Sequence, residues 1–401
     1  MKALFFAVAM LASTAYAADG KLKSGTFDPP RMAPDFTLAG SDGSELTLKE
    51  YRGKVVALGF GFTNCPEICP TTLSTLAKAR RKLGASGDGM QVVYVTVDPQ
   101  RDSPEQMRKY LADSLVHWVR DFGVDGFRCD VGGGVPESFW NEARKALDKV
   151  NPDVVLLSES DRPDDQLQAF DINYNFQYYL SVRFVLRDGA PASKVRDGWQ
   201  QMHDTMPRGA RLLHYTDNHD WQRSVVQYGE KASEAANVLD FTLDGIPFVY
   251  NGQEVADPTA THWRGHAPIR WKDSGNSDDE KSIEASEAFY KKLFAMRAAE
   301  PVLTSGDVIW INNTEPDSVL SFLRKKGNDE VLVILNLSNR QVHVTIDLPV
   351  MDYSAVQNLL TPDKTWFQLY SGRVSANLDA FGYVVGKKIP LAPLKGQREP
   401  E

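Results

Sequence analysis

Two clusters of reactive side chains stand out in this sequence of 401 residues. In the run GFRCDVGGG (126–134), an arginine and an aspartate lie two residues apart inside an expected β-strand. Side chains of a strand alternate between its faces, so Arg128 and Asp130 share one face. The other face is apolar: Phe127, Cys129 and Val131. Unpaired charges are costly to bury, so Arg128 and Asp130 either form a structural ion pair or line a functional cavity. This stretch alone leaves both interpretations open.

The second cluster is the pair of cysteines in CPEIC (65–69), at an expected turn from a strand to a helix. A helix start lowers the pKa of a thiol, so Cys65 and Cys69 can form a disulfide or share a soft metal such as copper(I). Two unrelated buried cysteines are the alternative. With Cys129 the chain has three cysteines, so at most one internal pair forms and one thiol is left over.

The N-terminus has the features of a secretory signal peptide. Lys2 precedes an apolar run, and Ala15-Tyr16-Ala17 matches the small-x-small pattern of a signal-peptidase site. We therefore expect a signal peptide over residues 1–19 and a periplasmic or secreted protein. The apolar run is too short to span a bilayer comfortably, so no stable membrane span is expected after cleavage. The net charge of −8 argues against a nucleic-acid partner and leaves neutral sugars open.

The elements that must position these residues change in kind along the chain. DFTLAG and SELTLKEY predict a hairpin, and the apolar run 54–62 predicts a buried parallel strand. A helix over 71–84 and the strand QVVYVTVD follow. Ser103-Pro104-Glu105 then opens a helix that runs without a break through YLADSLVHWVRDFG. The rhythm of strand and helix continues to about residue 299 and predicts a parallel sheet. From Val302 on, short alternating strands predict a small all-β domain.

The stretch PDFTLAGSDGSELTLKEYRGKVVALGFGFTNCPEICPTTL, followed by VVYVTVDPQRDSPEQMRKYLA, resembles the Sco/SenC family of thioredoxin-like copper chaperones. The resemblance covers residues 28–112 and implies a thioredoxin-fold half with Cys65 and Cys69 as copper ligands. The family's third ligand is a histidine in the second half of its domain, and that half has no counterpart here. Copper at the two cysteines is the one cofactor that the residues indicate, and they leave calcium open.

Four later fragments resemble the α-amylase family of glycoside hydrolases. They are GFRCD, VVLLSES, YTDNHD and FVYNGQE, in that order. Each alone is more typical of an ion pair, a solvated loop or a turn, and their joint occurrence in order favours the family. The resemblance implies a partial (β/α)8 TIM barrel over 113–300 and an all-β sandwich domain over 301–390. The whole chain is therefore interpreted as a chimera of two families.

The second resemblance also implies a mechanism and its residues. Retaining cleavage of α-glucosidic bonds in α-glucans would use Asp130 as nucleophile, Glu159 as acid/base and Asp220 as stabiliser. Arg128 and His219 would bind substrate. The charge of Arg128 would keep Asp130 ionised, while the apolar run VVLL before Glu159 predicts a raised pKa for that carboxyl group.

The sequence departs from the α-amylase pattern at its start. The family's first three strands and the domain inserted after the third have no counterpart, so we expect five strands where a closed barrel needs eight. The missing strands argue against a working cleft. Two alternatives therefore stand beside the glycosidase: a copper-binding or thiol-redox protein of Sco type, and an inactive fusion product.

Overall fold

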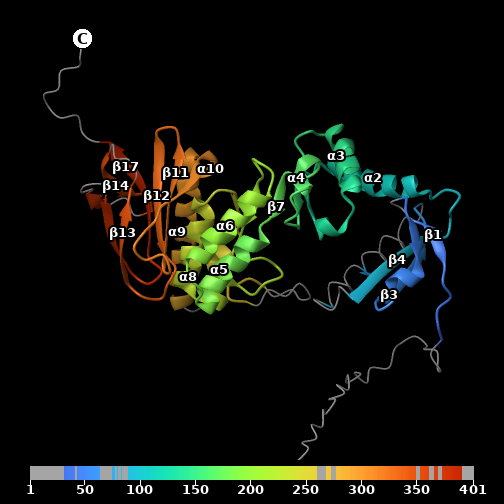
Figure 1. The fold of residues 1–401 in the computed structure, drawn as a ribbon, viewed down its shortest axis with the longest axis horizontal. Helices are drawn as coiled ribbons and strands as arrows, with labels where there is room; N and C mark the ends of the chain where they lie inside the picture. The colour runs from blue at the N-terminus through green and yellow to red at the C-terminus, as the bar shows by residue number, and fades with distance from the viewer. Residues whose placement is uncertain are drawn as a thin grey trace, which may run out of the picture. The chain divides into compact units, whose positions relative to one another are not determined.

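The computed structural model describes residues 31–40, 43–63, 75–76, 79, 83, 89–259, 268–271, 277–348, 353–360, 365–368 and 373–390 (Figure 1). The chain divides into two compact units, Met1–Arg108 and Lys109–Glu401. Helix α2 (Pro104–Phe122) spans this division as one unbroken element, as its sequence predicts. The predicted signal peptide, residues 1–19, lies outside the described residues.

The first unit holds two small sheets. Strands β1 (Thr37–Ala39) and β2 (Glu45–Thr47) pair antiparallel, which confirms the predicted hairpin. Strands β3 (Val55–Gly61) and β4 (Met90–Thr96) pair in parallel. The thioredoxin-like fold stays a prediction, because most of the predicted helix over 71–84 lies outside the described residues.

One prediction about this unit is wrong. The apolar run of β3 was expected to be buried, yet Val55, Leu58 and Phe60 are exposed. Strand β3 pairs with β4 alone within the part of the chain that the structure describes. A sheet of two strands covers little of its own surface, so apolar sequence alone does not bury a strand.

The second unit begins with a parallel sheet of five strands in the order β5-β6-β7-β8-β9. Its strands are β5 (Gly126–Cys129), β6 (Val155–Ser158), β7 (Ile172–Tyr174), β8 (Leu212–His214) and β9 (Ile246–Pro247). The expected number of parallel strands is thus present. Closure into part of a barrel stays a prediction, because the described residues pair β5 and β9 on one side only.

Helices follow these strands. They are α3 (Glu137–Asp148), α4 (Asp165–Gln168), α5 (Phe176–Asp188), α6 (Ser193–Thr205), α7 (Ser224–Tyr228), α8 (Glu230–Thr242), α9 (Ser277–Ala299) and α10 (Pro301–Ser305). Helix α5 is well capped: the Asn175 side chain accepts a hydrogen bond from the Tyr178 N–H, and Gly189 ends the helix at φ 72°. A positive φ of this kind favours glycine, so the glycine at position 189 explains why the helix ends there.

The C-terminal part is the predicted all-β domain. One sheet has the order β10-β11-β12-β17-β14-β15, and β13 pairs with β16 in a second sheet. The bounds are β10 (Asp307–Trp310), β11 (Val319–Lys326), β12 (Asp329–Asn336), β13 (Val342–Asp347), β14 (Tyr353–Asn358), β15 (Thr365–Gln368), β16 (Arg373–Leu378) and β17 (Tyr383–Pro390). Apolar side chains of both sheets form one buried cluster, which is how a sandwich packs.

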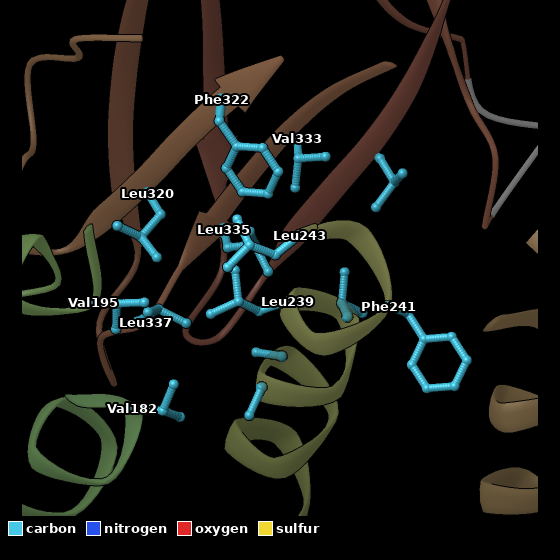
Figure 2. Close-up of a cluster of buried hydrophobic side chains, with 14 of the residues drawn as sticks. Val182, Val195, Leu239, Phe241, Leu243, Leu320, Phe322, Val333, Leu335 and Leu337 are labelled. Atoms are coloured by element: carbon cyan, nitrogen blue, oxygen red, sulfur yellow. The ribbon is translucent and has the colours of Figure 1, made fainter. Parts of the chain in front are cut away.

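A single apolar core joins the helices to this β-domain. Leu239 of α8 and Leu243, directly after that helix, pack against Phe322 of β11 and Val333 of β12 (Figure 2). Helix α10 accordingly lies beside the strands β11 and β12, and α8 lies beside β12, while α9 packs on both helices (Figure 1). The β-domain therefore covers the helical layer that supports the parallel sheet.

Candidate active site

The predicted catalytic side chains follow the carboxyl ends of three parallel strands. Asp130 comes directly after β5, Glu159 directly after β6, and Asp220 lies in the loop after β8. The carboxyl ends of parallel strands open at one edge of the sheet, where ligands of such sheets are bound. The order of the strands in the sheet therefore brings together residues that lie up to 90 positions apart in the sequence.

Arg128 bridges the first two carboxylates. Its Nη1 donates to Asp130 Oδ1 at 2.5 Å, and its Nη2 forms an ion pair with Glu159 Oε1. The side chains of Arg128, Asp130 and Glu159 are 27%, 38% and 14% exposed, so the cluster opens to solvent at Asp130. The structure shows the ion pair, at a partly open strand end, and a functional cavity lined by these charges stays a prediction.

The backbone after β5 turns sharply and gives Glu159 a second partner. Val131 has φ 48° and ψ 46°, and its N–H donates to Glu159 Oε2 at 2.7 Å. The left-handed conformation costs a non-glycine residue about 1–2 kcal/mol. The prediction that Val131 shares the apolar face of the strand is wrong: the strand ends at Cys129, and the Val131 side chain is half exposed. Strain at this point directs the N–H toward the carboxylate.

The pKa of Glu159 lies above its usual value. Burial is the largest cause, because it disfavours the charged carboxylate, and the charges of Asp130 and Asp220 act in the same direction. The Val131 N–H and the Arg128 charge oppose the shift without reversing it. This direction agrees with the expectation from the apolar run VVLL and suits a carboxyl group that gives up a proton.

The loop after β8 presents the third carboxylate. The buried Asn218 accepts hydrogen bonds from the backbone N–H groups of Asp220 at 2.9 Å and Trp221 at 3.1 Å. His219 Nε2 lies 3.5 Å from Asp220 Oδ2, and both side chains remain partly exposed. The Asn218 amide thus shapes the turn, which leaves His219 and Asp220 open to a ligand.

A buried ionic network supports this loop, and the sequence analysis missed it. Arg223 lies 3.8 Å from Asp217 and 3.6 Å from Asp257, and its guanidinium carbon lies 4.7 Å from the centre of the Tyr250 ring. Arg223 also donates to the Asn251 carbonyl at 2.8 Å. The network ties the loop after β8 to the loop after β9. The signal available in the sequence was a pair of opposite charges around NHD (218–220), namely Asp217 directly before it and Arg223 shortly after it.

Tyr174, at the end of β7, is a second residue that the sequence analysis missed. Its ring lies beneath Arg128, with 5.6 Å from the ring centre to the guanidinium carbon. Burial raises the pKa of Tyr174, and its side-chain hydrogen bond with Arg128 and the charge of Arg128 oppose the shift. A strand of three residues is too short to show a clear hydrophobic period, so the sequence pattern did not indicate that Tyr174 lies at the site.

The cysteines differ in what the structure says of them. Cys65 and Cys69, the predicted copper ligands, lie outside the described residues. Within the described ranges, no group of three His, Cys, Asp or Glu side chains is arranged to hold a metal ion. Cys129 is a free, buried thiol whose pKa is raised to about 12 by burial. No helix of the described part of the chain is long and apolar enough to cross a bilayer.

Comparison with known families finds three matches along the chain. Residues 25–120 match the SCO1/SenC family, residues 98–330 match the alpha amylase catalytic domain, and residues 310–372 match the alpha amylase C-terminal all-beta domain. The expectation of a chimera of these two families is confirmed.

Individual relatives agree with the larger match. Alpha-amylase MalA of Haloarcula japonica is 30% identical over 254 residues, which cover 61% of this chain and 35% of the relative. A cyclomaltodextrinase of Geobacillus thermopakistaniensis is 25% identical over 70% of this chain and 47% of the relative. The chain thus spans between a third and a half of the length of these relatives.

A solved structure shares the fold. The maltogenic alpha-amylase AmyB of Thermotoga neapolitana superposes with a TM-score of 0.61 at 24% identity, and the match covers 79% of this chain and 82% of that chain.

Proposed function

This chain belongs to the α-amylase family, and we propose that it is a retaining glycoside hydrolase that cleaves α-glucosidic bonds. The observation that carries the proposal is the bridge from Arg128 to both Asp130 and Glu159. One guanidinium that contacts two carboxylates keeps them close together. Retaining enzymes need such closeness, with carboxyl groups about 5–5.5 Å apart, because one of them attacks the sugar directly.

In the proposed reaction, the Asp130 carboxylate attacks the anomeric carbon while Glu159 donates a proton to the glycosidic oxygen. The bond from the sugar to the leaving group breaks, and a glycosyl ester on Asp130 forms. Glu159, now ionised, then takes a proton from a water molecule that attacks the ester, which frees the sugar and regenerates both groups. The raised pKa of Glu159 supports its role as the initial acid.

Asp220 and His219 would act on the sugar rather than on the bond that breaks. A carboxylate that accepts hydrogen bonds from sugar hydroxyls, more strongly as the ring flattens, lowers the barrier of the reaction. Their partial exposure, beside a turn fixed by Asn218, supports this role.

We propose α-glucans as the substrate class, with short linear and cyclic maltooligosaccharides as the first candidates. This choice follows the names of similar proteins, which include cyclomaltodextrinases and maltogenic amylases. The match to less than half of those curated chains leaves open which sugar is preferred, so the assay must include several.

The test is turnover by the purified full chain. A chromogenic α-glucoside, soluble starch and a cyclomaltodextrin are each assayed with the unaltered protein, Asp130→Asn and Glu159→Gln. We expect turnover that falls at least about a thousandfold in either variant, since each removes one of two groups that act as a unit. NMR of the first product identifies the anomer, and an inverted product contradicts a retaining mechanism. Absence of turnover in a protein that melts cooperatively supports the inactive fusion product.

A second candidate function belongs to the N-terminal part and rests on the SCO1/SenC match over residues 25–120. We propose copper(I) binding or thiol–disulfide exchange through Cys65 and Cys69. His117 is the one histidine within this match, and it pairs with Asp121 on helix α2. The donors that the resemblance assigns within this stretch are therefore the two thiols. Binding of one copper(I) per chain, lost in Cys65→Ser, supports the first activity. A reversible disulfide without copper binding supports the second.

A further inference from the structure

We propose that Tyr174 is a positioning residue that holds the Arg128 guanidinium between Asp130 and Glu159. The inference deepens the glycosidase proposal and rests on it for its kinetic consequence. No feature of the sequence pattern marked this tyrosine, and it reaches the site only through the register of the sheet.

The register places Tyr174 on the same level as the two carboxylates. Arg128 pairs with Leu157, and Leu157 pairs with Ile172, so these three residues form one rung on one face. Asp130, Glu159 and Tyr174 each come two residues later. Ile172 and Tyr174 share a face within β7. Asp130 and Glu159, directly after their strands, both contact Arg128, so all three lie on the side from which Arg128 projects.

The ring of Tyr174 is held firmly. It packs against Phe176 at 5.6 Å and against Tyr215 at 5.4 Å between ring centres, and Tyr174 is only 4% exposed. A ring packed on several sides cannot turn without opening a void, so its position relative to β5 is fixed. The guanidinium above it therefore rests on a rigid surface, an arrangement that attracts a cation to the face of the ring.

Arg128 needs such support because its two carboxylate contacts differ in kind. Nη1 makes a hydrogen bond with Asp130 Oδ1, whereas Nη2 is paired with Glu159 by charge and lacks hydrogen-bond geometry. A contact that depends on charge alone sets no orientation. A flexible arginine loses about 2 kcal/mol of rotamer entropy when it is fixed, so a support that limits its freedom favours the bridging position.

The orientation of Arg128 affects the protonation of Glu159. Glu159 is faced by Arg128 and Asp130 from the end of β5, by Tyr174 from β7, and by Tyr215 and Asp220 from the loop after β8. Arg128 supplies the positive charge among these groups. Without Tyr174, the guanidinium is expected to stay with its hydrogen-bonded partner Asp130 and to move away from Glu159, which raises the pKa of Glu159 further.

The experiment measures that pKa directly. Protein labelled with ¹³C at the glutamate carboxyl carbons is titrated by NMR, and the Glu159 resonance is assigned by its absence in Glu159→Gln. In Tyr174→Leu, which removes the ring, the pKa of Glu159 should rise by about one unit, as expected when an opposite charge withdraws. Tyr174→Phe keeps the ring and loses the hydroxyl, which interacts with Arg128 through a side-chain hydrogen bond, so a smaller rise is expected. Tyr179→Phe is the matched control, because Tyr179 packs on Tyr215 and Trp221 without touching Arg128.

An unchanged pKa of Glu159 in Tyr174→Leu, or in Tyr174→Phe if the leucine variant does not fold, overturns the inference. An equal shift in Tyr179→Phe also overturns it, because the effect would then come from general loosening of the aromatic cluster. The titration needs no turnover, so a shift without activity separates this inference from the glycosidase proposal. In an active protein, the alkaline limb of kcat/KM should move upward by the same amount as the pKa.

Discussion

Arg324 of β11 is expected to carry much of the stability of the contact between the helices and the β-domain. It is fully buried and donates three hydrogen bonds to backbone carbonyls, to Thr242 at 2.6 Å, Leu303 at 2.8 Å and Gly306 at 2.7 Å. Thr242 is the last residue of α8, and the other two lie within or just after α10. The last carbonyls of a helix have no partner within it, so one arginine side chain caps two helices.

The perturbation is Arg324→Met, which keeps the apolar stem and removes the donors. Hydrogen bonds from a charged donor contribute about 1.5–3 kcal/mol each. Burial of the guanidinium, which lowers its pKa to about 10, offsets on the order of 3 kcal/mol of that gain. The three bonds exceed the burial cost, so we expect a loss of roughly 2–5 kcal/mol in the free energy of unfolding.

The assay is urea unfolding followed by tryptophan fluorescence. Trp199 of α6 and Trp310 of β10 pack edge to face at 5.6 Å, so their emission reports on this contact between helix and strand. Lys326→Met is the matched control on the same strand: its ammonium donates to Ser305 Oγ from an exposed position, and little change is expected. A loss below about 1 kcal/mol in Arg324→Met, or an equal loss in the control, would refute the reasoning.

Three further outcomes follow from two buried charged groups and one strained residue. Burial raises the pKa of Asp240 to about 8, above its unfolded value, so its contribution to stability is full below about pH 4 and is lost as pH rises toward 8. Relative to the unaltered protein, Asp240→Asn should therefore gain on the order of 4 kcal/mol in the free energy of unfolding between pH 5 and pH 8, measured by urea unfolding. A difference that does not change with pH would contradict this. Val131→Gly should relieve about 1–2 kcal/mol of backbone strain, and the greater entropy of glycine in the unfolded chain offsets about 0.5–1 kcal/mol of that gain. The melting temperature should therefore rise slightly, while kcat should fall because the more flexible backbone holds the Glu159 carboxylate less firmly. A lower melting temperature argues against strain at this residue. Arg223→Met removes the cation beside the buried Asp217 and leaves the buried Asp257 with Arg270 as its cationic partner, so it should cost about 3–5 kcal/mol in urea unfolding. A cost near zero would show that the network does not stabilise the loops.

Local chemistry was the part of the site that the sequence could predict. Arg128 and Asp130 are two residues apart on one strand, so alternation alone predicted their shared face and the ion pair follows from it. The family resemblance predicted that Glu159 belongs beside them, and its contact with Arg128 agrees. Tyr174 escaped because its contact depends on the register between β5, β6 and β7, a property of three segments together.

The errors have the same physical origin. Val131 was expected to continue the alternation, but the chain enters the left-handed region at that residue and the strand is already over. The apolar run of β3 predicted a strand correctly and its burial wrongly, because burial depends on which neighbours cover a strand and not on its own composition. Fold and strand order follow from local pattern more readily than does the packing that completes a site.

The burial of Cys129 makes the chain chemically selective. Thiol reagents and oxidants act on the thiolate, and a buried thiol with a pKa of about 12 is almost entirely protonated and shielded at neutral pH. In the native protein, Cys129 at the end of β5 is therefore protected from these reagents. Labelling or oxidation of a thiol under native conditions therefore excludes Cys129, so the thiol chemistry proposed for Cys65 and Cys69 can be tested in the intact chain without removing Cys129.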